Sequence, residues 1–414
     1  MQHRMFVVVT FVVAVSAFPA LTSASECTPT STNRPVCPAG AVPEAATFID
    51  PTAAIADASD VRIGPHSYIA PFAGLVTDGD IRIGEKTNLQ DSVTLDGKGR
   101  MALGDEVILA HGARVSAPAR IGRMAVAGEH NAAFIGFNSH VDRAFVEHDA
   151  MVLHLARVAP GITIKAGKVV LSGKNVTTQA QADDPALGKV VPITDALRAF
   201  MDGVLHVNET FAREYTRMYQ QDRATVTGIN YDPGNSDFNP TRNLPTLAGR
   251  ATRDPRHRNR IIGDVQLADS LAALNNTRVV GNQISLRADE GEPFHAGPIR
   301  RMKDRTTFHA LEHTGIEIHD HVSYGFRTLV HGGSSAATVG NAHSATVIGD
   351  ETTIGDYAVV FRSVVGEAVS IGCGSLVDGS TLLDGTVVPK LTIVINRGHA
   401  GATTYPVEWN PGCR

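Results

Sequence analysis

The sequence predicts an all-β protein made of two tandem left-handed parallel β-helices built from hexapeptide repeats, the first with a flanking α-helix. Aliphatic residues recur every six positions in both halves, many are followed by Gly, Ala or Asp, and only 6% of the residues are aromatic. In a triangular β-helix each side of a coil is a short strand with one inward aliphatic side chain, and a small residue allows the corner. A period of six fits neither amphipathic helices nor half-buried strands.

The six-residue period occupies two separate stretches of the chain. Its members in the first stretch are Ile63, Ile69, Leu75, Ile83, Leu89, Leu95, Leu103, Leu109, Val115 and Ile121, and in the second Ile348, Ile354, Val360, Ile371, Val377 and Leu383. The period breaks at 127–150 and at 332–345. We expect these two segments to leave the coil as loops.

Residues 192–222 follow a different pattern, with apolar residues at helical spacing. They are Ile193, Leu197, Phe200, Met201, Val204, Leu205 and Phe211, and they predict a helix packed along the outside of the first β-helix. Residues 225–254, rich in Asn, Pro and Arg, predict a linker. The expected units are therefore 47–224 and 255–414, in keeping with two domains for a chain of 414 residues.

The N-terminus predicts a cleaved signal peptide over residues 1–24, since Arg4 precedes an apolar run and small residues lead to Ala24. We therefore expect a secreted or periplasmic protein. In that environment Cys27 can pair locally with Cys37, and Cys373 with Cys413; neither spacing suits a zinc–cysteine site. The formal charge of -5 indicates neither a nucleic-acid nor an anionic membrane partner.

The second unit carries a run of chemistry-bearing residues. Arg287 opens the segment R-A-D-E-G-E-P, His309 opens H-A-L-E 22 residues later, and His331 lies in V-H-G after a further 22 residues. This pattern resembles the gamma-class carbonic anhydrases, which have R-x-D-E-G-x-P, a His at that distance and a later V-H-G. The resemblance implies that His309 and His331 bind a metal. The family has another ligand five residues before the last His, and here that position is Phe326.

The first unit has lost the complementary residues. Gln90 and Asp91 match the family's segment before the first ligand, and His111 in L-A-H matches the middle ligand, but Asp96 and Ser116 stand where the other two ligands fall. In the family the first and last histidines come from one subunit and the middle one from its neighbour. The resemblance therefore implies a composite site of His111, His309 and His331 between an N-type and a C-type unit.

The chemistry of that set explains the residue types. Three neutral imidazoles and an open position let a divalent metal hold a water and lower its pKa to about 7, so that hydroxide can attack carbon dioxide and give bicarbonate. Imidazole suits Zn²⁺, Fe²⁺ and Co²⁺ alike; zinc is the metal we expect first. The resemblance further assigns Glu290 a place beside the metal, Glu312 the transfer of the proton outward and Gln90 the orientation of hydroxide or substrate. Asn208 corresponds to the family's late asparagine near the metal.

The resemblance also implies interface ion pairs, in which Arg287 joins Asp289, Asp304 or Asp91 and holds adjacent units together. It implies a homo-oligomer of the trimer-ring type, although two alternating unit types cannot alternate around an odd ring. An alternative metal site would use His321 within the second unit. Alternative functions are a non-catalytic structural or assembly protein and a hexapeptide acyltransferase, which would require a catalytic His and a coenzyme A groove.

Overall fold

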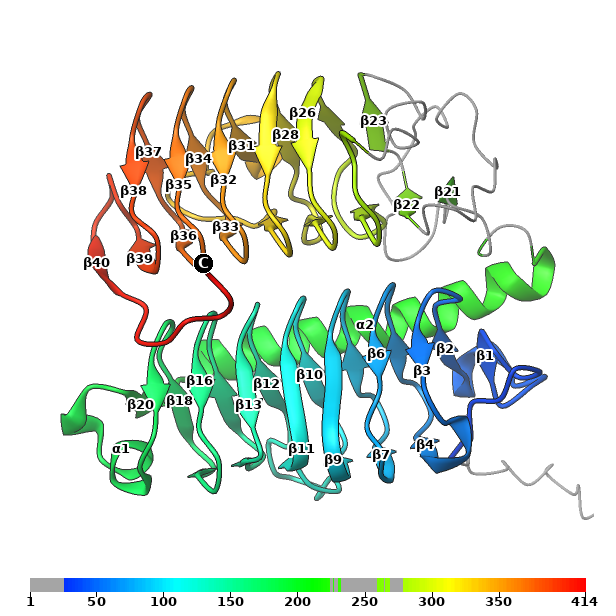
Figure 1. The fold of residues 1–414 in the computed structure, drawn as a ribbon. Coiled ribbons are helices and arrows are strands. Elements are labelled where there is room, and N and C mark those ends of the chain that lie inside the picture. The colour runs from blue at the N-terminus through cyan, green and yellow to red at the C-terminus, as the bar shows by residue number, and fades with distance from the viewer. Residues whose placement is uncertain (1–25, 224–225, 227–229, 232–258, 264, 269–277) are drawn as a thin grey trace, which may run out of the picture.

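A computed structural model of the chain describes residues 26–223, 226, 230–231, 259–263, 265–268 and 278–414. In this part of the chain, short strands stack into two parallel β-helices that lie side by side (Figure 1). The predicted fold class, with its flanking helix, is confirmed. The expected signal segment 1–24 and most of the expected linker 225–254 lie outside the described residues, so the unit boundaries at 224 and 255 remain predictions.

The first β-helix consists of two described sheets. One has the order β1 (Val36–Cys37), β2 (Thr47–Ile49), β5 (Tyr68–Ile69), β8 (Asn88–Leu89), β10 (Val107–Leu109), β12 (Ala133–Ile135), β15 (Ala150–Val152), β18 (Lys168–Val170), β20 (Val190–Pro192). The other holds β3 (Ala54–Ile55), β4 (Val61–Ile63), β6 (Gly74–Leu75), β7 (Ile81–Ile83), β9 (Thr94–Leu103), β11 (Arg114–Ile121), β13 (His140–Asp142), β14 (Phe145–Val146), β16 (Arg157–Val158), β17 (Thr163–Ile164) and β19 (Asn175–Val176). The long strands β9 and β11 turn a corner and so join two faces in one sheet.

The second β-helix has three described sheets. The first has the order β21 (Asn230–Tyr231), β22 (Arg260–Gly263), β24 (Ser285–Ala288), β27 (Thr307–His309), β30 (Leu329–His331), β33 (Val359–Phe361), β36 (Leu376–Asp378), β39 (Thr392–Ile395), β40 (Thr403–Pro406). The second has β23 (Val265–Leu267), β25 (Phe294–Ala296), β28 (Ile316–Ile318), β31 (Thr346–Ile348), β34 (Val364–Val365), β37 (Thr381–Leu382), and the third β26 (Ile299–Met302), β29 (Val322–Tyr324), β32 (Thr353–Ile354), β35 (Ser370–Ile371), β38 (Val387–Val388).

Inward aliphatic side chains stack in columns because successive coils pair in register. In the first β-helix Ile69, Leu89 and Leu109 are register partners in successive strands, and each is fully buried. The other predicted inward residues of this half are also buried. Removal of these side chains from water stabilises each coil by about 25 cal/mol per Å² of apolar surface buried.

Two details of the hexad prediction are wrong. The segment 127–150 is not one loop, since β12, β13 and β14 continue the coil and bury Ile135, Val141 and Val146. Leu383 is 77% exposed, and Leu382 takes the inward place. Some sides of the coil contain five residues rather than six, as from Val141 to Val146, so a strict six-residue count loses the inward position there. The other expected loop, 332–345, does leave the coil and includes the short helix η4 (Ala342–Ser344).

Helix α2 (Asp195–Gln221) returns the chain along the molecule, so the two β-helices run in the same direction (Figure 1). It begins at Thr194, whose side chain accepts a hydrogen bond from the Leu197 N–H and so satisfies a free backbone donor of the first turn. The remaining described helices are short: α1 (Gln179–Asp183), η1 (Pro43–Ala45), η2 (Ala58–Asp60) and η3 (Pro185–Leu187).

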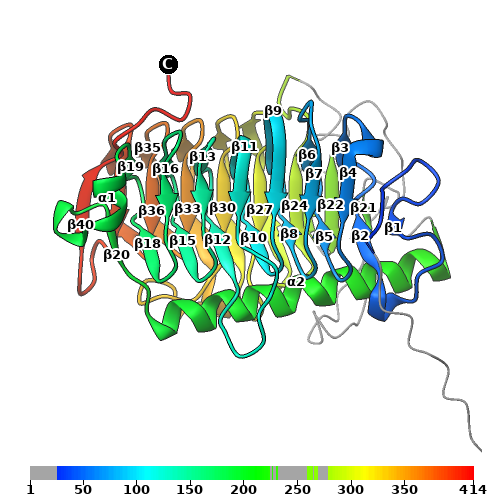
Figure 2. The same ribbon diagram turned by 90° about the horizontal axis from the view of Figure 1, so that it is seen from below.

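The nine-stranded sheets of the two β-helices face each other across a seam, and α2 runs along one edge of it (Figures 1 and 2). Outward side chains of both sheets form one apolar cluster there, with Ile108 and Phe134 from the first β-helix and Leu329 and Val359 from the second. Met201 of α2 joins the same cluster. The helix therefore flanks both β-helices rather than the first alone.

The four cysteines form the disulfides Cys27–Cys37 and Cys373–Cys413, a pairing that the sequence left open. No helix in the described part of the chain combines the length and the apolar character that crossing a membrane requires.

Close stacking of the coils predicts that alanine substitutions at two glycines change the free energy of unfolding in opposite directions. A Cβ on Gly84, at a corner of the first β-helix, would overlap the backbone of Gly104 in the next coil, whereas a Cβ on Gly203, exposed on α2, would meet no heavy atom within 4 Å. We expect Gly84→Ala to lower the free energy of unfolding by about 1–3 kcal/mol and Gly203→Ala to raise it by about 0.5–1 kcal/mol. Urea denaturation followed by circular dichroism measures both; equal midpoints for the two variants would contradict the stacking.

Candidate metal centre

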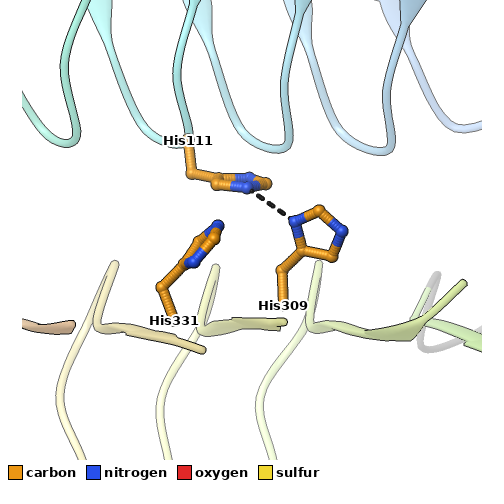
Figure 3. A group of neighbouring side chains, drawn as sticks. All are labelled: His111, His309 and His331. Carbon is orange, nitrogen blue, oxygen red and sulfur yellow. Dashed lines mark hydrogen bonds between the residues drawn. The ribbon is translucent and has the colours of Figure 1, made fainter. Parts of the chain in front are cut away.

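Three histidines meet at the seam between the β-helices. His309 ends β27 and His331 ends β30, and the two are register partners, so their side chains leave the same face of one sheet. His111 follows β10 by two residues and comes from the first β-helix. Figure 3 shows the three rings pointing toward one another across the seam. The three imidazoles that the sequence singled out thus lie together within a single chain.

The spacing of the three rings suits one ion. The candidate ligand nitrogens all lie within 4.8 Å of one another, and His111 Nε2 is 3.1 Å from His309 Nδ1. A tetrahedral metal with bonds of 2.0–2.1 Å to nitrogen would separate its ligand atoms by about 3.3–3.4 Å. All three side chains are buried, with exposed fractions of 2–3%. Because surrounding residues enclose these side chains, their rings have little freedom to change orientation.

The outer nitrogens of the rings face acceptors. His111 Nδ1 lies 3.1 Å from Asp91 Oδ2, His309 Nε2 lies 3.5 Å from Asp289 Oδ1, and His331 Nδ1 donates to the Gly332 carbonyl over 2.7 Å. With the protons on these outer nitrogens, the three inner nitrogens would be free to bind a metal. Three converging imidazole nitrogens within 4.8 Å of one another form a donor set that fits a divalent metal.

Burial keeps these rings neutral, which is the form that binds metals. It lowers the pKa of His309 to about 4, with a further contribution from the nearby Arg287 guanidinium. The pKa of His331 lies well below its ordinary value, first through burial and then through the charge of His309. Burial also lowers the pKa of His111, although Asp91 opposes this.

Arg287 crosses the seam and is 1% exposed. Its Nη1 lies 2.7 Å from Asp91 Oδ2 of the first β-helix, and its Nη2 lies 2.8 Å from Asp289 Oδ2 of its own strand end. Burial alone would raise the pKa of both carboxyls, but Arg287 and the adjacent histidines hold each well below its usual range. Asp304, the other expected partner, lies elsewhere: its carboxylate accepts from the Asn282 N–H over 2.9 Å.

Two glutamates connect the centre with solvent. Glu290 is buried, its Oε2 lies 3.5 Å from His309 Nε2, and burial raises its pKa to about 8. Its Oε1 accepts the backbone N–H of Glu312 over 3.0 Å, and the Glu312 side chain is 44% exposed. The buried carboxyl of Glu290 thus contacts the backbone of a residue whose own carboxyl is exposed and pairs with His313 over 3.4 Å.

A small cavity of about 30 Å³ adjoins His309 and His331. Its lining is mostly apolar: Phe134, Phe137, Phe200, Val204, Val207, Leu311 and Phe361, with Gln90, Asn208 and Glu290 as further polar members. A cavity of this size holds one or two water-sized molecules. The Gln90 Oε1 accepts from the His111 N–H over 3.2 Å, so its NH₂ group remains as a donor. The Asn208 Nδ2 donates to the Val204 carbonyl over 2.8 Å.

Sequence reasoning missed the aromatic walls. Phe137 has its ring centroid 5.0 Å from that of His331, and Phe361 lies 5.3 Å from the same ring. Phe361 is the register partner of His331 in the next strand, so the repeat itself carried a signal for it. Phe137 carried no such signal, because the coil that contains it was expected to be a loop.

The alternative ligand positions lie outside the cluster. His321 is exposed. Phe326 packs its ring 5.4 Å from that of Tyr357. Ser116 hydrogen-bonds to Asp96 and to His140 Nε2, over 2.8 and 2.9 Å.

Comparisons with known proteins found two curated relatives and several solved structures. No protein-family model matches the chain. It is 29% identical over 175 residues to a carbonic anhydrase of Methanosarcina thermophila, an alignment covering 39% of this chain and 65% of that protein. It is 30% identical over 142 residues to the carboxysome assembly protein CcmM of Nostoc sp., covering 34% and 24%. Neither relative is therefore matched over two thirds of its length. A hexapeptide transferase family protein from Anaplasma phagocytophilum has a TM-score of 0.29 and 23% identity, covering 41% of this chain and 93% of that one.

The buried ion pairs at the seam predict that substitution of Arg287 lowers the free energy of unfolding much more than substitution of Arg114 does. Arg287→Met leaves Asp91 and Asp289 buried without their cation and should lower the free energy of unfolding by about 3–5 kcal/mol. Arg114 is 51% exposed and pairs with Asp96, so Arg114→Met should cost less than about 1 kcal/mol. Chemical denaturation of both variants compares the losses. Similar losses would show that the seam does not depend on Arg287.

Proposed function

We propose that this chain, which belongs to the gamma-carbonic-anhydrase-like hexapeptide-repeat proteins, hydrates carbon dioxide reversibly at one metal centre between its two β-helices. The observation that carries the proposal is the set of His111, His309 and His331, with their lone pairs directed at one point beside a small cavity. Carbon dioxide is small and apolar, and both properties match that cavity. The set is complete in one chain, so it requires no second copy.

His111, His309 and His331 would hold the metal. When bound to three neutral imidazoles, a divalent metal supplies a water that is activated near neutral pH. Zinc is our first expectation, and Fe²⁺ and Co²⁺ have the same preference for imidazole. Asp91 and Asp289 lie 3.1 and 3.5 Å from the outer nitrogens of His111 and His309, where they would favour protonation of those nitrogens and so the ligand tautomer.

The cavity walls would bind and orient the substrate. Phe137, Phe361 and Val207 offer apolar contacts on which carbon dioxide loses little hydration. The Gln90 amide can donate to a substrate or product oxygen, and Asn208 adds a second amide at the wall formed by α2. These groups supply position rather than proton transfer.

Glu290 and Glu312 would carry the proton away from the centre. Glu290 lies within the cavity and beside His309, while Glu312 reaches solvent. Burial raises the pKa of Glu290 to about 8, so near neutral pH this carboxyl holds a proton that it must release outward before it accepts the next. Glu312 then passes it to the bulk, because its ordinary exposure lets water and buffer reach it.

A non-catalytic role in assembly is the second candidate, favoured by the similarity to the carboxysome assembly protein. Measured hydration activity distinguishes the two candidates.

We also propose export of the mature chain, supported by the apolar N-terminal run and by the two disulfides. A homo-oligomer remains a prediction for light scattering, independent of the metal centre.

Metal analysis tests the centre directly. We expect purified protein to hold about one metal ion per chain, as one tetrahedral site requires. His111→Ala removes a ligand from the first β-helix and should abolish both bound metal and carbon dioxide hydration in stopped-flow assays. The matched control is His321→Ala, since His321 is exposed and outside the cluster. Full metal occupancy in His111→Ala would refute the composite site.

Truncation of the exposed carboxyl tests the proton path. Glu312→Ala should lower kcat by about 10²-fold, the lower end for a lost proton-transfer group, with a smaller effect on kcat/KM, and added small buffers should restore part of kcat. Glu317→Ala removes a carboxyl that is 55% exposed on β28 and pairs with His319; its rates should equal those of the wild type. An unchanged kcat in Glu312→Ala at low buffer concentration would exclude this path.

A further inference from the structure

Helix α2 contributes a hydroxyl to the ionic network beside the metal centre. Tyr215 is fully buried, and its OH donates to Asp289 Oδ2. The same oxygen accepts from Arg287 Nη2 over 2.8 Å. Asp289 is also fully buried. Two donors, one from α2 and one from the second β-helix, therefore hold a single carboxylate oxygen.

That arrangement determines which way the carboxylate turns. Tyr215 and Arg287 Nη2 both donate to Oδ2, Arg287 Nε donates to Oδ1 over 3.2 Å, and Oδ1 lies 3.5 Å from His309 Nε2. A carboxylate that accepts from the outer nitrogen of a histidine fixes the tautomer and the ring angle, and so aims the inner nitrogen. Arg287 Nε also donates to both oxygens, over 3.2 and 3.1 Å, so loss of the tyrosine hydroxyl loosens the carboxylate and leaves Arg287 alone to hold it.

We propose that Tyr215 is a positioning residue for the metal: through Asp289, its hydroxyl holds His309 in the orientation that binds the ion, an assignment that rests on the metal site of the proposed function. Nothing in the motif that resembles the carbonic anhydrases includes this tyrosine, which lies 74 residues before Asp289 in the chain. The same helix lines the cavity with Val204, Val207 and Asn208. The hydroxyl therefore ties that wall to a metal ligand.

The hydrogen bonds of Arg287 also extend to the carboxylate beside His111. Arg287, which shares Oδ2 with Tyr215, also binds Asp91, and Asp91 faces His111 Nδ1. One guanidinium thus holds both carboxylates that back metal ligands, one from each β-helix. Tyr215 acts on only one of them, so its loss should disturb His309 and leave the seam closed.

Tyr215 also has a packing role, and the two roles are separable. Its ring lies 5.2 Å from that of Phe48, 5.7 Å from that of Phe211 and 5.9 Å from that of Tyr68, between centroids. Phenylalanine keeps these ring contacts and removes only the hydroxyl. Tyr68 provides the matched control. It is equally buried, and in the described part of the chain its OH has no hydrogen-bond partner.

The experiment compares Tyr215→Phe with Tyr68→Phe in the full chain, with Co²⁺ as the probe. Cobalt affinity is measured by titration, ligand geometry by the visible absorption of the bound ion, and folding by the melting temperature of the metal-free protein. We expect Tyr215→Phe to weaken cobalt binding by about 10–100-fold and to alter the absorption spectrum, while it melts close to the wild type. Tyr68→Phe should match the wild type in affinity and spectrum.

Unchanged affinity and spectrum in Tyr215→Phe would overturn the positioning role while wild-type cobalt binding leaves the proposed function standing. Equal losses in both variants would also overturn it, since they would reveal a general packing effect. Wild-type protein that binds no cobalt would overturn both. If Tyr215→Phe does not fold, 3-fluorotyrosine at position 215 keeps ring and hydroxyl and strengthens the donor; an identical cobalt spectrum would then refute the link.

Discussion

A buried guanidinium fixes how the two β-helices dock. Parallel coils repeat every 4.7–4.9 Å or so, and their apolar outer faces would tolerate a slip by one coil. Arg287 opposes such a slip, because a slip would carry Asp91 away from it and leave unpaired charges buried in the seam. The same slip would move His111 away from His309 and His331. This ion pair and a second buried pair across the seam, Arg260 with Asp50, therefore favour the one register in which the three imidazoles meet.

Because the two units belong to one chain, formation of the site does not depend on association between chains. Between separate subunits, a shared metal site forms only at concentrations where the subunits associate. Here α2 brings the chain back to the start of the second β-helix, so the docking is intramolecular and independent of protein concentration. This explains how each unit can lack the residues that the other supplies. Phe326 and Ser116 occupy positions from which no ligand is needed once the seam site is complete.

The sequence predicted most inward residues because each side of a coil requires one apolar side chain at nearly constant spacing. It lost the register where a side has five residues, which hid β12 to β14 and misplaced Leu383. For the site, the spacing of motifs identified the histidines and carboxylates. It could not identify Tyr215, since a helical stripe of apolar residues says only that a face is buried. Which buried hydroxyl meets which carboxylate depends on the docking of α2, and no local pattern encodes that.

The cavity beside the three histidines has both apolar and polar lining, and both suit the proposed reaction. Most of the cavity wall consists of aromatic and aliphatic side chains, which suit an apolar gas. Its polar members include Glu290, whose Oε1 accepts from the Glu312 backbone N–H, and the Glu312 side chain is 44% exposed. In the proposed positioning role, the hydroxyl of Tyr215 would link the α2 wall of the cavity through Asp289 to His309, in addition to the apolar packing of α2 against both β-helices.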